Sequence, residues 1–219
     1  VLAREIAYAA EAGVYWAFLN YAWDRDLTRP LRRFVKHPDR EQVNFTMILS
    51  SACLFDDQEW ENHFKEFLQQ ACTMQNFQTV LGGRPLIYAF APNQVKDPEN
   101  LPKLKARMDE IKILIEKETG KQPYAVFFMH CLSPEDWPEI RDCGFDATTL
   151  YAHFAPDTVS FKQFHKQITE SWKGWTELDQ NVPLLSAGWD NRPRYYTKVP
   201  WVDQHEGMLK RYSEEPTAD

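Results

Sequence analysis

The sequence predicts an α/β fold, a parallel sheet covered by helices, and three observations lead to this prediction. Short apolar runs of strand length alternate with amphipathic helical segments along the chain. The predicted strands are almost continuously apolar, which is typical of parallel strands buried on both faces. With 219 residues, of which 43% are hydrophobic, the chain can bury one sizeable core, so we expect a single domain over residues 1–219.

Each predicted element has a local signal in the sequence. Residues 2–12 have helical apolar spacing and end before Gly13, a typical C-terminal helix cap. Further helices are predicted at residues 31–35, 57–73, 101–119, 134–143 and 160–178. Apolar runs predict strands at residues 14–19, 44–49, 85–90, 124–129, 146–151 and 183–187. Residues 191–219 are polar and contain prolines, so this segment is predicted to be an irregular tail.

Two architectures fit this alternation, an open doubly wound sheet and a (β/α) barrel. No glycine-rich phosphate loop follows any predicted strand, which disfavours the nucleotide-binding versions of the open sheet. Aromatic and polar residues follow the strands instead, and in a barrel all of these strand ends face one mouth. We therefore predict a TIM-like (β/α) barrel that is incomplete, because about six strand–helix units are visible where a closed barrel has eight.

Composition narrows the classes of partner. The net charge is −7 and no basic stripe is present, so a nucleic-acid partner is not expected. No apolar run is long enough to span a membrane. Eight tryptophans suggest that the protein binds ligands with flat apolar faces, such as sugars. The exposed edges of an incomplete barrel invite pairing, so a homodimer that covers them is a further expectation.

No cofactor is predicted, and the cellular compartment is not determined by the sequence. The four cysteines Cys53, Cys72, Cys131 and Cys143 lack the CxxC spacing of metal or redox sites. We interpret them as buried thiols, since cysteine packs as a small hydrophobic residue. An even number of cysteines is also compatible with disulfides and secretion.

Five segments resemble one known family. They are EIAYAAEAGVYWAFLNYAW, VNFTMILSS, GRPLIYAF, FDATTLYAHF and SAGWDNRPR. In this order they resemble the WbsX-like proteins and their relatives in glycoside hydrolase family 99, the endo-α-mannosidase type. The most specific match is AGWDNRPR, and the segments are spread along most of the chain, from residue 5 to residue 194. The resemblance implies a (β/α) barrel that binds or cleaves an oligosaccharide or polysaccharide.

The chain departs from the family pattern at the catalytic residues. In the family, a pair of glutamates lies in an Asn-Glu-Trp-x-Glu-Gly type motif on the last strand, and this sequence contains no such motif. The partial likeness at residues 205–207 follows no apolar strand, and we interpret it as a coincidence. We expect the first and last strands of the family barrel to be missing from this sequence.

Asp24 and Asp190 are the candidate catalytic residues. They are the best pair of carboxylates at predicted strand ends, and glycosidases hydrolyse through two carboxyl groups and an oxocarbenium-like transition state. Asp190 has an alternative interpretation as a structural carboxylate paired with Arg192 or Arg194. Asp24 has an alternative role as the N-terminal cap of the segment that follows.

The candidate sugar-binding residues share a position at or after a predicted strand end. They are Asn20, Tyr21, Trp23, His130, Tyr151, His153, Trp189, Asn191 and Arg192. The aromatic residues among them have an alternative role as lids over the core, and a histidine at a strand end is often a structural residue.

Three function hypotheses follow from these residues. The first is a glycoside-hydrolase-like protein that cleaves glycosidic bonds by carboxyl acid/base chemistry. The second is a non-catalytic carbohydrate-binding remnant or partial gene product. The third is a metal-dependent barrel hydrolase using His130, His153 and Asp190, although the His-x-His ligands typical of such enzymes are missing and we predict no metal site.

Overall fold

The computed structural model describes residues 1–23, 27–130, 132–155, 157–176, 178, 180–197 and 203–215. The chain forms two compact units, Val1–Thr148 and Thr149–Asp219. No helix within the described ranges is long and apolar enough to cross a membrane.

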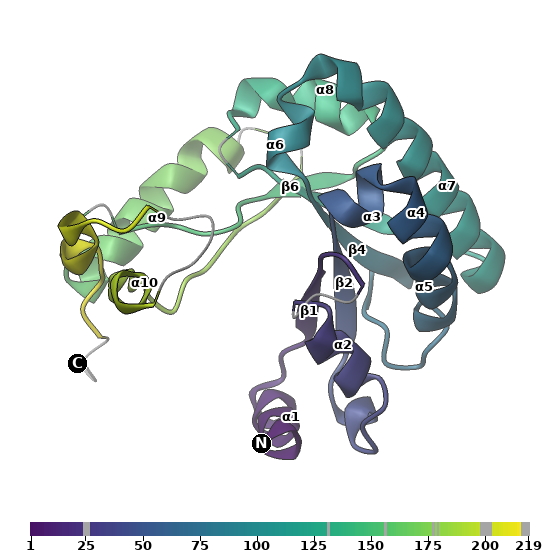
Figure 1. Cartoon of the computed structure of the whole chain (residues 1–219), viewed down its shortest axis with the longest axis horizontal. Helices are drawn as coiled ribbons and strands as arrows, with labels where there is room; N and C mark the ends of the chain where they lie inside the picture. The colour runs from purple at the N-terminus through teal and green to yellow at the C-terminus, as the bar shows by residue number, and fades with distance from the viewer. Residues whose placement is uncertain are drawn as a thin grey trace. The chain divides into compact units, whose positions relative to one another are not determined.

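The first unit is built on a parallel sheet whose strands follow their order in the sequence (Figure 1). The parallel strands, from the edge inward, are β1 (Trp16–Asn20), β2 (Phe45–Ser50), β4 (Arg84–Phe90), β5 (Tyr124–Phe128) and β6 (Ala147–Thr149). A short strand, β3 (Thr79–Val80), adds to β4 in antiparallel orientation. The register places Met47 of β2 opposite both Phe18 of β1 and Ile87 of β4.

Helices fill the connections between these strands. The α-helices of the first unit are α1 (Leu2–Ala12), α2 (Arg29–Phe34), α3 (Ser51–Phe55), α4 (Asp57–Glu59), α5 (Lys65–Ala71), α6 (Pro92–Val95), α7 (Leu101–Thr119) and α8 (Trp137–Asp142). Tighter or wider turns are η1 (Arg40–Gln42), η3 (Pro98–Asn100) and η4 (Pro134–Asp136), which are 3₁₀-helices, and η2 (Trp60–Phe64), a π-helix.

The sequential strand order separates this sheet from doubly wound sheets, in which the order reverses at a switch point. Crossovers between parallel strands are right-handed, so a sheet wound in one direction carries its crossover helices on one face. Figure 1 shows α3, α4, α5 and α7 on the same side of β2 and β4. The sheet is open with β1 at its edge, and the described residues close no barrel.

An aromatic cluster joins α2 to the first two strands on the helix-covered face. The Phe34 ring of α2 is fully buried and lies 5.3 Å from Trp16, 5.2 Å from Phe18 and 5.4 Å from Phe45, measured between ring centroids. Because Phe34 contacts both β1 and β2, this cluster holds the edge strand β1 against the sheet. Alternate residues of a strand point to opposite faces, so Tyr88 lies on the face of the sheet opposite to this cluster.

The second unit contains α9 (Phe161–Thr176), β7 (Asn181–Val182), α10 (Arg192–Tyr196) and the 3₁₀-helix η5 (Glu206–Lys210). Its small core consists of buried Ala155, Phe164 and Ile168, with Val159, Trp172 and Trp189 packed against them. The Thr149 hydroxyl donates to the Val182 carbonyl at 2.8 Å, and the Trp172 indole donates to the Leu184 carbonyl at 3.1 Å.

The α/β class and the parallel sheet are confirmed, and several local predictions are corrected. The predicted strand at residues 183–187 is wrong, because β7 ends at Val182. Pro183 has no N–H to donate to a ladder, and Leu185 is 70% exposed. The predicted helix at residues 57–73 is interrupted by η2. The segment from residue 191, expected to be irregular, contains α10 and η5.

Candidate functional site

The predicted site residues fall into two groups, one in each unit. The first unit contains Asn20, Tyr21, Trp23 and His130, and the second contains Tyr151, His153, Trp189, Asp190, Asn191 and Arg192. The candidate carboxylate Asp24 lies outside the described residues.

The Trp189–Asn191 segment is held in place by a downstream segment of the second unit. The Trp189 N–H donates to the Ser213 hydroxyl at 2.9 Å, and the Ser213 N–H returns a hydrogen bond to the Trp189 carbonyl at 2.7 Å. The Asn191 N–H donates to the Arg211 carbonyl at 2.9 Å. Gly188 enters this pairing with φ 140, and a Cβ there would lie 3.1 Å from the Ser213 oxygen. Glycine is therefore required at the turn.

Asp190 and Arg192 form a bidentate ion pair. The Arg192 Nε donates to one carboxylate oxygen at 2.9 Å and Nη2 donates to the other at 2.8 Å, while the Arg192 backbone N–H also donates at 2.9 Å. The hydrogen bonds from the Arg192 side chain lower the pKa of Asp190 below its ordinary value. The carboxylate is therefore ionised at neutral pH, and both of its oxygens already accept hydrogen bonds.

Two arginines lie over aromatic rings beside this pair. The Arg192 guanidinium carbon is 3.9 Å from the Tyr212 ring centroid, and that of Arg194 is 4.8 Å from the Trp189 ring centroid. Arg194 also donates to the Asn191 side-chain oxygen at 3.0 Å. Such cation–π contacts orient both the cation and the ring.

The same surface is rich in exposed aromatic and polar groups. The Phe154 ring is 4.8 Å from the Trp189 ring, nearly perpendicular to it, and Phe154 is half-exposed. The side chains of Asp190 and Arg192 are 40% and 45% exposed. Tyr151 is also exposed. We call the group formed by Phe154, Trp189, Asp190, Arg192, Arg194 and Tyr212 the ion-pair surface. The predicted residue Asn191 is buried and accepts the hydrogen bond from Arg194.

His153 is half-buried and contacts one hydroxyl. The Ser171 oxygen lies 3.2 Å from Nε2 of His153, and the Ser171 hydroxyl is 2.7 Å from the Ile168 carbonyl, to which it donates. Burial lowers the pKa of His153, so the imidazole is neutral at pH 7. With its proton directed to the Ile168 carbonyl, Ser171 is not arranged as an activated nucleophile.

Asn20 and Tyr21 differ in their access to solvent. Asn20 is fully buried at the end of β1, and its side-chain nitrogen donates to the Phe18 carbonyl at 2.8 Å. Its side-chain oxygen accepts no hydrogen bond from the part of the chain that the structure describes. The Tyr21 side chain is exposed, and the Tyr21 backbone N–H donates to the Thr28 hydroxyl at 3.1 Å.

Trp23 is packed among side chains of the first unit. The His63 ring stacks on it with centroids 5.6 Å apart, and the Arg32 guanidinium lies over it at 4.8 Å. Phe64 and Phe67 contact its edges. These neighbours occupy ring surface that a stacked sugar would need, an arrangement that matches the alternative role of an aromatic lid.

His130 lies near the carboxyl end of β5. Its ring centroid is 5.9 Å from that of Phe90, and burial, with a smaller effect from Lys96, lowers the pKa of the imidazole. Within the described ranges, no group of three or more histidine, cysteine, aspartate and glutamate side chains could hold a metal ion.

Three members of the ion-pair surface are not among the candidate site residues that the sequence predicts, namely Phe154, Arg194 and Tyr212. Phe154 directly follows the predicted residue His153, and Arg194 lies two residues after the predicted residue Arg192, so their positions in the sequence could have indicated them. Tyr212 and Ser213 had no signal, because they lie in a polar segment without periodicity and reach Trp189–Arg192 only through tertiary pairing.

Comparisons of the chain with protein-family models, with curated proteins and with solved structures found no match.

Proposed function

We propose that the chain is a glycoside-hydrolase-like, carbohydrate-active protein, and that its ion-pair surface contacts the sugar. The observation that carries this proposal is the exposed, bidentate Asp190–Arg192 pair, in the same unit as the half-exposed Phe154 ring that packs on Trp189. Sugars present vicinal hydroxyls beside flat C–H faces. A carboxylate and a guanidinium side by side offer acceptors and donors to those hydroxyls, and the half-exposed Phe154 ring offers apolar contact area.

In this proposal Asp190 acts in its ionised form. Arg192 lowers its pKa, so Asp190 suits a nucleophile, a general base or an electrostatic partner of an oxocarbenium-like transition state. A general acid needs a raised pKa, and a different carboxyl group must supply that proton.

The fold part of the proposal is an incomplete (β/α) barrel. Its support is the sequential order of the parallel strands, since closed barrels are wound in one direction and doubly wound sheets are not. The open edge at β1 leaves backbone groups available for a further strand, for which a second copy of this chain is one source.

Binding without hydrolysis is the second candidate function. It is favoured by the engagement of Asp190, whose two oxygens both accept hydrogen bonds from Arg192. A carboxylate in this state recognises hydroxyls through its remaining lone pairs but is a weaker nucleophile.

The test is a hydrolysis and binding screen of the purified chain on polysaccharides and aryl glycosides. Asp190→Asn should lower kcat about 10²-fold or more while sugar binding persists, because the charge is lost and the shape is kept. Trp189→Ala should weaken binding. Asp203→Asn, at an exposed aspartate of the same unit, is the matched control and should change neither.

Three other results decide against parts of the proposal. Binding without turnover by the folded wild-type chain favours the second candidate. Turnover that is unchanged in Asp190→Asn removes this residue from the mechanism. A folded chain that neither binds nor cleaves any sugar of the panel overturns the proposal as a whole.

A further inference from the structure

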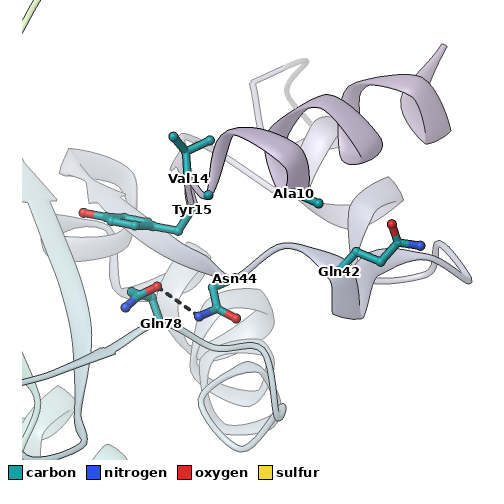
Figure 2. Close-up of a pocket in the computed structure, with 7 residues that line it drawn as sticks. Ala10, Val14, Tyr15, Gln42, Asn44 and Gln78 are labelled. Atoms are coloured by element: carbon teal, nitrogen blue, oxygen red, sulfur yellow. Dashed lines mark hydrogen bonds between the residues drawn. The ribbon is translucent and has the colours of Figure 1, made fainter.

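A second feature lies in the first unit, at the amino ends of β1 and β2, whereas the predicted site residues of this unit follow the carboxyl ends of the strands. A cavity of about 380 Å³ opens there, within the range of about 300 to 1,000 Å³ usual for small-molecule sites. Figure 2 shows Ala10, Val14 and Tyr15 on one side of it and Gln42, Asn44 and Gln78 on the other. We call it the amide pocket.

The polar side of the amide pocket is fixed by the backbone of the sheet. The Asn44 carbonyl accepts from the Trp16 N–H at 2.9 Å, and the Gln78 N–H donates to the Phe45 carbonyl at 2.7 Å. The two side chains are joined, because the Asn44 amide nitrogen donates to the Gln78 amide oxygen at 3.2 Å (Figure 2). The Gln78 nitrogen also donates to the Thr79 carbonyl at 2.7 Å. The Asn44 and Gln78 amides are therefore linked before any ligand arrives, which reduces the entropic cost of binding to them.

The opposite side supplies apolar surface. The Tyr15 ring is 39% exposed, and its hydroxyl is tethered to the Tyr88 hydroxyl at 2.8 Å. Val14 is half-exposed beside it. A tethered phenol ring keeps its orientation, so it can serve as a flat contact surface for the C–H face of a ligand.

Among the described residues, the lining carries no ionisable group other than the Tyr15 phenol. The Gln42 side chain is exposed and forms no hydrogen bond within the residues that the structure describes. The Gln42 amide offers two donors and an acceptor, the combination that matches hydroxyl groups. The Asn44 and Gln78 amide nitrogens each already donate one hydrogen bond, to the Gln78 side-chain oxygen and to the Thr79 carbonyl, and each keeps one N–H for a ligand. A charged ligand would find no counter-ion in this lining.

From this geometry we infer that the amide pocket binds an uncharged polyhydroxylated ligand, a single neutral sugar residue, with the amides on its hydroxyls and Tyr15 against its C–H face. The inference goes beyond the proposed function, because it assigns a binding site in the first unit that shares no residue with the ion-pair surface.

The test uses the ¹⁵N-labelled full chain titrated with neutral monosaccharides and disaccharides. The expected result is a saturable shift of the side-chain NH₂ signals of Gln42, Asn44 and Gln78. Gln42→Ala and Gln78→Ala should each raise the Kd about two- to tenfold, the effect of one lost hydrogen bond. Gln58→Ala, at an exposed glutamine of α4, is the matched control and should leave the Kd unchanged.

Two results would overturn the inference. One is the absence of any shift of the three NH₂ signals with every neutral sugar at high millimolar concentration. The other is a Kd that changes equally in Gln42→Ala and Gln58→Ala. Trp189→Ala separates this site from the proposed function, since it should leave the pocket signals and their Kd unchanged while sugar binding at the ion-pair surface is weakened.

Discussion

The buried Asn76 side chain fixes the backbone around Gln42, which lines the amide pocket. Its replacement tests how much these hydrogen bonds contribute to the stability of the first unit. Its side-chain nitrogen donates to the Arg40 carbonyl at 2.8 Å and to the Val43 carbonyl at 2.9 Å, on either side of Gln42. Asn76 is 3% exposed, so water cannot replace these bonds without a rearrangement. Asn76→Ala therefore removes the side-chain donor of the Val43 carbonyl, while the Arg40 carbonyl keeps the hydrogen bond from the Val43 N–H at 3.2 Å.

The expected cost follows from the two bonds. The bond to Val43 is buried and the bond to Arg40 is partly buried. A stranded buried acceptor costs about 1–3 kcal/mol and a partly buried hydrogen bond about 1 kcal/mol, so the sum is about 2–4 kcal/mol. With a slope of about 2 kcal/mol per molar urea, the unfolding midpoint should fall by about 1–2 M.

The assay is urea unfolding followed by far-UV circular dichroism. Asn76→Asp should be at least as destabilised as Asn76→Ala, because a carboxylate has the same size but donates nothing to the two carbonyls. Asn62→Ala, at an exposed asparagine, should stay within about 0.5 kcal/mol of wild type. A loss below about 1 kcal/mol in both Asn76 variants would refute the reasoning.

Four further predictions test other parts of the structure. Phe34→Ala should cost about 3–5 kcal/mol in urea unfolding, because a fully buried ring is removed; a loss below about 1 kcal/mol would contradict the packing. Gly188→Ala should cost about 1–3 kcal/mol, since φ 140 is strained for any residue with a Cβ, and an unchanged midpoint would show that this turn adapts. Burial lowers the pKa of His153 in the folded state. The unfolded state therefore binds more protons below about pH 6.5, and stability should fall from pH 7 to pH 5.5. His153→Gln should reduce that fall, and an identical pH profile would assign it to other groups. Burial raises the pKa of Cys53 to about 12, so its thiol should not react with iodoacetamide at pH 8 until the chain unfolds, as checked by peptide mapping; rapid labelling of the folded chain would exclude this environment.

Helix ends were the most predictable features of the fold. The predicted helices at residues 2–12 and 101–119 have the same bounds in the structure. Both end at a glycine in the left-handed conformation, Gly13 with φ 66 and Gly120 with φ 73. Glycine adopts this conformation without the steric penalty of a Cβ, so the stop signal is local and can be read from one residue.

The candidate site was predictable only in part. The sequence pointed to the segment around Trp189 and Asp190, and the structure pairs Asp190 with Arg192, one of the alternatives considered for this carboxylate. Tyr212 and Ser213, which hold that segment, carried no pattern. The amide pocket was not foreseen either, because amide side chains in loops have no periodicity.

The sequence by itself determined the α/β class, the sequence of helices and parallel strands, and the polar character of the segment after residue 187. These properties follow from local signals: apolar periodicity, capping glycines and residue chemistry. The tertiary structure decided which groups face one another, as with the Gln78 amide and Asn44, 34 positions apart. It also decided that the sheet stays open at β1 in the described chain. Strand pairing and side-chain contacts across the sheet depend on residues far apart in the chain, so no short window of sequence contains them.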